Sequence, residues 1–315
     1  MNYELIRKKI KGPVYSIVTP FLENDDIDYK SLEKYIEYAV AQGAEHFYVM
    51  GYNSRYSELS WDEIKQLNAF VAKKVKSIKP DGIMIVANPL HCSTKVSTEF
   101  AKHAEDIGAD IISIICREKF YFEEQIYAHY EYIAKRSKIG ILVHEMPFLS
   151  GLGGPDVNWP LSLLKRIAEI DNVVALKEDA KNDAYSKDLI SVLNKHVSII
   201  ISGGGKRQWL RNVDYGCQAW LNGIGVFEPK LASNFWAHYN KGDRAFCDDM
   251  IARIEVPFFE QGVQKFGWHL TIKAALEERG LMSRHERLPM MALPEERARK
   301  VKELIRSLPI NDFIK

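Results

Sequence analysis

The sequence predicts an α/β fold, a single (β/α)₈ or TIM barrel, on three observations. Short apolar runs alternate eight times with longer amphipathic stretches up to about residue 240. The apolar runs are nearly continuous, which is typical of parallel strands that are covered on both faces. After residue 240 only helical patterns follow. We therefore expect one structural unit, with a barrel over residues 1–240 and a C-terminal helical appendage over residues 241–315.

The predicted strands are short and rich in β-branched residues. They lie at 13–20, 44–51, 82–89, 109–116, 139–147, 172–179, 197–204 and 218–225. The helical patterns between them lie at 31–43, 61–75, 97–108, 123–136, 161–170, 184–196, 206–216 and 230–242. Asp28 and Ser60 precede two of these helices, and both residue types are favoured N-caps. Several of the helical patterns stop at glycine, the residue that most easily takes the left-handed conformation past a helix end.

The main alternative to a barrel is a doubly wound open sheet. Such a sheet usually carries a glycine-rich phosphate loop after its first strand. Here the segment 19–28, TPFLENDDID, contains no glycine. The triplet Gly203-Gly204-Gly205 matches neither GxGxxG nor the P-loop pattern, so we interpret it as a tight loop at the barrel mouth.

Composition and charge exclude several classes of function. A net charge of +1 gives no electrostatic reason to expect nucleic acid or an anionic membrane as a partner. The four cysteines, Cys92, Cys116, Cys217 and Cys247, are scattered without a CxxC pair, so neither a zinc site nor a disulfide framework is expected. Residues 1–15 lack the apolar core of a signal peptide, and no apolar run is long enough to span a bilayer. We expect a cytoplasmic protein.

One lysine stands near the carboxyl end of a predicted strand, where barrel enzymes place their active sites. Lys177 shares a strand face with Ala175, while Val174 and Leu176 share the other face. If Val174 and Leu176 pack under the helices, Lys177 points into the barrel. Burial there lowers the pKa of a lysine, which can then attack a carbonyl as a neutral amine and form an iminium. The alternative is a strand-end lysine that lies in solvent or pairs with Glu178.

Several segments resemble the dihydrodipicolinate synthase / N-acetylneuraminate lyase superfamily of class I aldolases and lyases. Residues 12–51 contain TPF after the first strand and an Asp-initiated helix, and 172–179, NVVALKED, resemble the Schiff-base strand with its lysine at Lys177. Residues 272–281 and 287–304 resemble the terminal helices. The resemblance implies a barrel with three C-terminal helices, commonly assembled as a homotetramer. It also implies a covalent Schiff base on the lysine, with no metal or organic cofactor.

The chain departs from this family at three motifs. The Gly-Thr-Thr-Gly-Glu motif that holds the substrate carboxylate after strand 2 reads Gly51-Tyr52-Asn53-Ser54-Arg55. The proton-shuttling tyrosine at the end of strand 5 is replaced by His144, and the paired tyrosines after strand 4 are replaced by residues 117–121, REKFY. These departures argue against dihydrodipicolinate synthase activity and against N-acetylneuraminate lyase activity.

The substituted positions supply the candidate site residues. An imidazole has an unperturbed pKa of about 6.5, so His144 is expected to move protons in place of the tyrosine. Its alternative is a neutral histidine that is hydrogen-bonded in the barrel without a catalytic task. Tyr52 and Asn53 are candidates for binding the substrate carboxylate, as is Arg55, whose alternative is a subunit contact or solvent. The other substrate-binding candidates, where the family lines its pocket, are Ser202, Gly203 and Ile224.

These observations lead to one main hypothesis and two alternatives. The chain is expected to be a class I lyase, either an aldolase or a dehydratase, that acts on pyruvate or a 2-keto-3-deoxy sugar acid through an iminium on Lys177. Its partners would be a small-molecule 2-keto acid and further copies of the chain, as a tetramer or dimer. The first alternative, motivated by the three altered motifs, is a catalytically silent keto-acid-binding member of the family. The second is a binding module for nucleic acid or another protein, which the fold and the charge balance disfavour.

Overall fold

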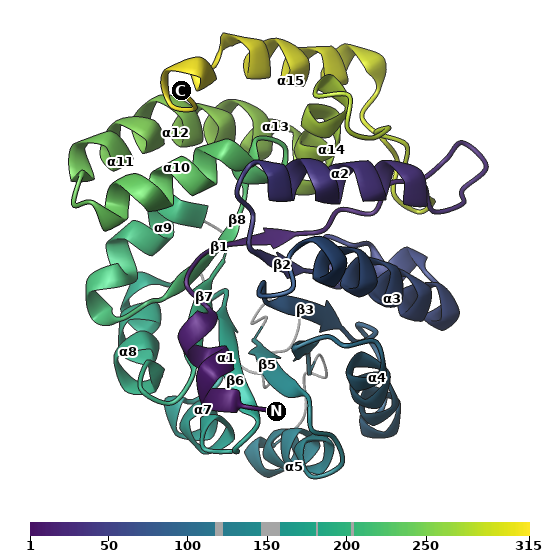
Figure 1. Ribbon diagram of the computed structural model, residues 1–315, viewed down its shortest axis with the longest axis vertical. Helices are drawn as coiled ribbons and strands as arrows, with labels where there is room; N and C mark the ends of the chain where they lie inside the picture. The colour runs from purple at the N-terminus through teal and green to yellow at the C-terminus, as the bar shows by residue number, and fades with distance from the viewer. Residues whose placement is uncertain (117–121, 146–157, 181, 203–204) are drawn as a thin grey trace.

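Eight parallel strands close into a barrel in the computed structural model (Figure 1). The structure describes residues 1–116, 122–145, 158–180, 182–202 and 205–315. The strands pair in chain order from β1 to β8, and β8 pairs with β1 to complete the ring. The predicted (β/α)₈ fold with its C-terminal helices is confirmed.

Each observed strand overlaps one of the eight predicted strands and is shorter than predicted. The strands are β1 (Gly12–Ser16), β2 (His46–Tyr48), β3 (Met84–Ala87), β4 (Ile111–Ile114), β5 (Gly140–His144), β6 (Val173–Glu178), β7 (Ser198–Ile201) and β8 (Ala219–Asn222). The apolar runs continue past the ladder because residues such as Val49 and Met50 stay buried at the barrel mouth after their strand has ended. An apolar run therefore marks where a strand lies but extends beyond its carboxyl end.

The helices that follow the strands form an outer ring. They are α2 (Tyr29–Ala41), α3 (Trp61–Ile78), α4 (Thr94–Asp106), α5 (Glu123–Ala134), α7 (Leu161–Ala168), α8 (Asp183–Leu193), α9 (Gly205–Asn212) and α10 (Pro229–Asn240). Both predicted N-caps are confirmed: Asp28 accepts a hydrogen bond from the backbone of Ser31, and Ser60 forms a capping box with Glu63. Gly43 has a φ of 95°, which suits a residue that follows the end of a helix.

The C-terminal appendage lies beside α2 and α10 (Figure 1). A nearly continuous helical run comprises α11 (Arg244–Met250), α12 (Val256–Phe258) and α13 (Gln264–Phe266), joined by π-helical turns at Ile251–Glu255 and Phe259–Val263. The run ends at Gly267, whose φ of 82° is incompatible with a continued helix. The helices α14 (Trp268–Glu278) and α15 (Glu295–Ser307) follow. In the described part of the chain, no helix has the length and apolar character needed to cross a membrane.

A short helix, α1 (Tyr3–Lys9), covers the amino-terminal end of the barrel and was not predicted. Ile6 and Ile10 belong to the apolar cluster inside the barrel. The guanidinium of Arg7 donates to the carbonyl oxygens of Asp171 and Val173, at 2.7 and 3.0 Å. Because α1 covers this end, the opposite end, where the strands finish, is left to form the site.

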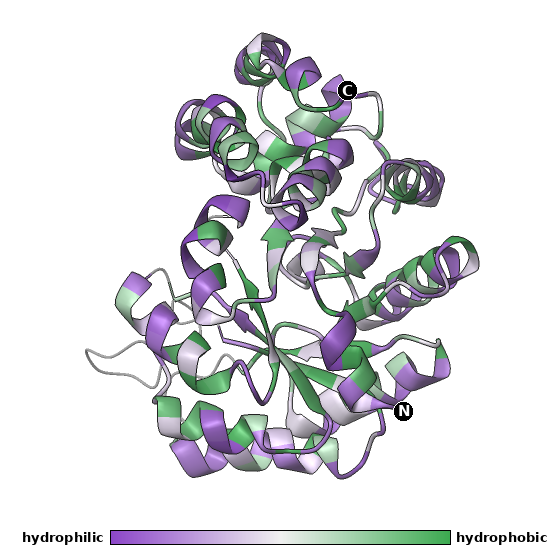
Figure 2. Cartoon of the chain, turned by 60° about the vertical axis from the view of Figure 1, so that its left-hand side comes forward, coloured by the Kyte–Doolittle hydropathy of each residue, from purple (hydrophilic) through white to green (hydrophobic). Residues whose placement is uncertain are grey.

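Two apolar layers support the barrel. Side chains inside it, such as Leu142 and Ala175, form one cluster, and those between strands and helices, such as Leu176, form the other. Figure 2 shows strands that are mostly hydrophobic, surrounded by helices that carry both hydrophobic and hydrophilic residues. The expectation that Val174 packs beside Leu176 was wrong, because Val174 belongs to the inner cluster. The register between β5 and β6 shifts at Ile141, so Val174 is passed over in the pairing.

Candidate active site

The side chain of Lys177 lies inside the carboxyl end of the barrel. Only 1% of the residue is exposed, so it does not end in solvent. Its Nζ lies 2.8 Å from His144 Nε2 and 3.0 Å from Asp179 Oδ2. Lys177 and His144 are direct partners in the β5–β6 ladder, and therefore both point to the same face of the sheet. The structure thus brings together the two residues that were expected to carry the chemistry.

The far side of the imidazole contacts a phenol from another strand. The hydroxyl of Tyr48, on β2, lies 3.5 Å from His144 Nδ1 and 2.5 Å from the Oγ of Ser113, on β4. Tyr48 is completely buried, and this burial raises its pKa well above the usual value near 10, so its hydroxyl stays protonated. Neither Tyr48 nor Ser113 was among the predicted site residues.

Two further carboxyl groups lie on the helix-facing side of the strands. Glu145 is completely buried and accepts hydrogen bonds from the backbone N–H of Trp159, at 2.7 Å, and the hydroxyl of Tyr185, at 3.2 Å. Burial is the main cause that raises the pKa of Glu145 to about 7. Glu178 accepts a hydrogen bond from the backbone N–H of Ala180, at 2.7 Å. Strand alternation places Glu145 and Glu178 on the opposite face from His144 and Lys177.

The loop after β2 contains three of the predicted substrate-binding residues. Asn53 is buried, and its Nδ2 donates to the Oγ of Ser16 on β1, at 3.2 Å. Tyr52 is 43% exposed. Arg55 has a left-handed backbone with a φ of 60° and forms a buried ion pair with Glu58. The guanidinium is therefore already neutralised by a carboxylate, and substrate contacts for these three residues stay predictions.

The remaining candidates follow β7 and β8. Ser202 is buried, and its backbone N–H donates to the carbonyl oxygen of Glu178, at 2.9 Å. Ile224 is buried at the start of a short 3₁₀ helix, Ile224–Val226, which follows β8. Gly203 lies outside the described residues, as does the segment 117–121 that replaces the family tyrosines.

A buried charged cluster joins the appendage to the loop after β1. The Nζ of Lys273, on α14, donates to the carbonyl oxygen of Thr19, at 3.2 Å, and lies 3.4 Å from Glu286 Oε1. The same carboxyl oxygen lies 2.8 Å from His269 Nε2. Burial is the largest cause that lowers the pKa of Lys273. This cluster was not predicted: His269 and Lys273 lie one turn apart on α14, but Glu286 lies beyond the end of that helix and Thr19 lies near the other end of the chain.

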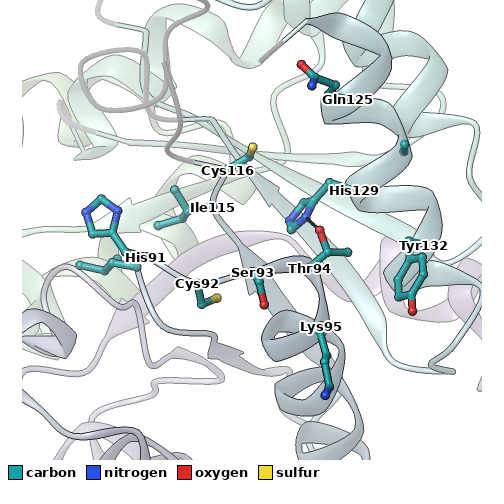
Figure 3. Close-up of a pocket in the computed structure, with 12 residues that line it drawn as sticks. His91, Cys92, Ser93, Thr94, Lys95, Ile115, Cys116, Gln125, His129 and Tyr132 are labelled. Atoms are coloured by element: carbon teal, nitrogen blue, oxygen red, sulfur yellow. Dashed lines mark hydrogen bonds between the residues drawn. The ribbon is translucent and has the colours of Figure 1, made fainter. Parts of the chain in front are cut away.

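A separate cleft of about 580 Å³ lies between α4 and α5, outside the barrel (Figure 3). Its lining includes His91, Lys95, Cys116 and His129, and the Nδ1 of His129 lies 2.9 Å from the Oγ1 of Thr94. None of the predicted site residues lines this cleft. Across the residues that the structure describes, no group of three or more His, Cys, Asp or Glu side chains is arranged to hold a metal ion.

Comparisons with known proteins agree with the fold. The model of the dihydrodipicolinate synthetase family matches residues 9–308. A 4-hydroxy-tetrahydrodipicolinate synthase of Archaeoglobus fulgidus is 24% identical over 307 residues, which cover 95% of this chain and 99% of the relative. A synthase of the same name from Parabacteroides distasonis is 27% identical over 305 residues, which cover 96% of this chain and 98% of the relative.

Solved structures share the same fold. Dihydrodipicolinate synthase from Oceanobacillus iheyensis superposes with a TM-score of 0.85 at 19% identity, covering 97% of this chain and 99% of that one. A prophage protein of the dihydrodipicolinic acid synthase family from Escherichia coli K12, solved in complex with pyruvate, gives a TM-score of 0.83 at 19% identity, covering 94% and 97%. With the family model matching almost the whole chain, this protein belongs to the dihydrodipicolinate synthetase family.

Proposed function

We propose that this chain is a class I lyase that binds pyruvate or a 2-keto-3-deoxy sugar acid as an iminium on Lys177. The observation that carries the proposal is the buried amine of Lys177, which lies between His144 Nε2 and Asp179 Oδ2. Membership of the family supports it, and so does the pyruvate complex of the Escherichia coli relative.

The first step makes the amine nucleophilic. His144 Nε2, 2.8 Å from Lys177 Nζ, accepts a proton from the ammonium group, and the neutral amine then attacks the keto carbon of the substrate. His144 returns the proton to the hydroxyl group of the resulting carbinolamine, which leaves as water. The product is a positively charged iminium. Asp179, whose carboxyl oxygen lies 3.0 Å from Nζ, is placed to stabilise that charge.

The iminium then acts as the electron sink for the second step. It withdraws electrons from the neighbouring carbon, so either a proton or a bonded carbon can leave that atom and produce an enamine. An enamine can add to an aldehyde, or it can expel a leaving group from the next carbon. Aldol cleavage, aldol addition and dehydration share this intermediate, and for that reason the proposal covers both carbon–carbon and carbon–oxygen lyases.

The loop after β2 is the proposed binding site for the substrate carboxylate. Ser54 Oγ donates to the carbonyl oxygen of Ile17, and Thr19 Oγ1 donates to the carbonyl oxygen of Ser54, each at 2.8 Å. These bonds fix the loop against the chain that leaves β1, and the fixed loop presents Asn53 near Ser16 at the barrel mouth. A rigid loop lowers the entropic cost of holding a small anion.

Borohydride trapping tests the proposal. The protein is incubated with pyruvate or a longer 2-keto acid, reduced with borohydride and digested, and the modified lysine is located by mass spectrometry. We expect a reduced adduct on Lys177, and none in Lys177→Met. Lys135→Met, which removes an exposed lysine at the C-cap of α5, should keep the adduct. Folded protein that gives no Lys177 adduct with any keto acid would refute the proposal, and an adduct without turnover would identify the silent binding protein.

A further inference from the structure

Each ring nitrogen of His144 has a partner inside the barrel. Nε2 lies 2.8 Å from Lys177 Nζ, and Nδ1 lies 3.5 Å from the hydroxyl of Tyr48. The Tyr48 hydroxyl in turn lies 2.5 Å from Ser113 Oγ. Four strands therefore contribute to one chain of polar groups, which runs from β6 through β5 and β2 to β4. These polar groups lie next to the apolar cluster inside the barrel, which contains Leu142.

Lys177 and Tyr48 require different hydrogen-bonding roles from the two ring nitrogens of His144. A neutral imidazole carries one proton, so one nitrogen donates and the other accepts. To take a proton from the Lys177 ammonium, Nε2 must be the bare nitrogen, and Nδ1 must then carry the ring proton. Nδ1–H faces the oxygen of Tyr48, which can accept that hydrogen bond while its own proton goes to Ser113 Oγ. The opposite tautomer would point an N–H at the amine, so Nε2 could not accept the proton of Lys177.

We propose that Tyr48 is a positioning residue that keeps the ring proton of His144 on Nδ1, so that Nε2 serves as the base for Lys177. This inference rests on the proposed iminium at Lys177. The phenol from β2 acts through the imidazole, since its hydroxyl contacts Nδ1 of His144 and Nε2 of the same ring contacts the amine.

The same contact stabilises the imidazolium that forms when His144 takes the proton. Among the described residues, the titratable groups around His144 include Lys177 from β6 and Tyr48 from β2, which contact its ring, and Asp179, which contacts Lys177. Glu145, the next residue in the chain, faces Trp159 on the other side of the strand. Loss of the Tyr48 oxygen removes an acceptor from Nδ1–H and disfavours the charged ring. The pH at which His144 becomes an active base should therefore fall.

The test is the rate of adduct formation in Tyr48→Phe. Pyruvate and cyanoborohydride trap the iminium on Lys177 over a range from about pH 5 to about pH 9, and the rate is followed by mass spectrometry. We expect a plateau rate at least about tenfold below wild type, with the midpoint of its acidic limb at lower pH. Tyr15→Phe is the matched control, because it removes a buried phenol on β1 that donates to the carbonyl oxygen of Pro229. It should leave the rate and the midpoint unchanged.

Two further variants separate positioning from folding. Ser113→Ala removes only the partner of the phenol and should shift the profile in the same direction by a smaller amount. In a His144→Gln background, Tyr48→Phe should cause no further loss, since the phenol acts through the imidazole. A Tyr48→Phe profile that matches wild type, or a loss that persists undiminished in His144→Gln, would overturn the inference. Wild-type protein without a Lys177 adduct would overturn the proposed function as well.

Discussion

Replacing Glu145 with glutamine should remove a pH dependence from the stability of the fold. Glu145 is completely buried at the end of β5, and burial is the main cause that raises its pKa from 4.5 to about 7. In the unfolded chain the carboxyl group ionises near pH 4.5. Between these two values the folded protein holds a proton that the unfolded chain has released, so stability falls as the pH rises through this window.

The pKa difference sets the size of the effect. At about 1.4 kcal/mol for each pKa unit, a rise from 4.5 to about 7 corresponds to a loss of roughly 3 kcal/mol by pH 8. Glutamine keeps a carbonyl oxygen that can accept from the N–H of Trp159 and the hydroxyl of Tyr185, and it carries no charge at any pH. Its amide N–H groups need partners of their own, so about 3 kcal/mol is the upper limit of the gain.

Urea unfolding of both proteins at several pH values measures the effect. The free energy of unfolding should be similar for the two near pH 5, and Glu145→Gln should be the more stable protein near pH 8, by up to about 3 kcal/mol. Glu169→Gln, at an exposed position that follows α7, removes the same charge and should show no such dependence. A stability difference between Glu145→Gln and wild type that stays constant with pH would refute the reasoning.

Two other variants test contacts made by α3 and α14. Ser60→Ala removes the capping box that Ser60 forms with Glu63, and should lower the free energy of unfolding by about 1 kcal/mol in urea titrations; an unchanged midpoint would show that the cap contributes nothing. Lys273→Met leaves the buried carboxyl of Glu286 without its lysine, and should destabilise the protein by about 3 kcal/mol or more in thermal unfolding. A variant as stable as wild type would mean that the nearby histidine alone compensates the charge.

Much of the fold could be predicted from sequence because each strand–helix unit is determined locally. The eight apolar runs and the caps at Asp28 and Ser60 are short-range signals, and the structure bears them out. Helix α1 was not predicted because it spans only seven residues, and the three residues that pack on the inner cluster, Tyr3, Ile6 and the C-cap Ile10, are too few to establish a helical period. The position of Val174 depends on a register shift between β5 and β6, and the sequence pattern of a single strand does not predict such a shift.

The site was only half predictable, for a geometric reason. Lys177 and His144 stand at the ends of adjacent strands, so alternation within each strand was enough to place them together. Tyr48 lies on β2, and no ladder connects β2 with β5. Which residues meet across the inside of a barrel depends on strand tilt and stagger, which no single segment encodes. Asp179 lies two residues after Lys177 in the predicted strand 172–179, so alternation could have placed it on the same face, but it was not among the predicted site residues.

The row of polar groups across the barrel bears on the proposed turnover of a keto acid. Lys177, His144 and Tyr48 are each at most 1% exposed, and burying such groups costs free energy unless they are hydrogen-bonded. The layer just below is filled by apolar side chains such as Leu142, so the fold itself does not need polar groups inside the barrel. Forming a single iminium on Lys177 uses His144 as a base once, whereas turnover repeats the proton transfers and requires His144 to return to the same tautomer each time. An imidazole with a partner on each nitrogen therefore favours a working lyase over a silent binding protein.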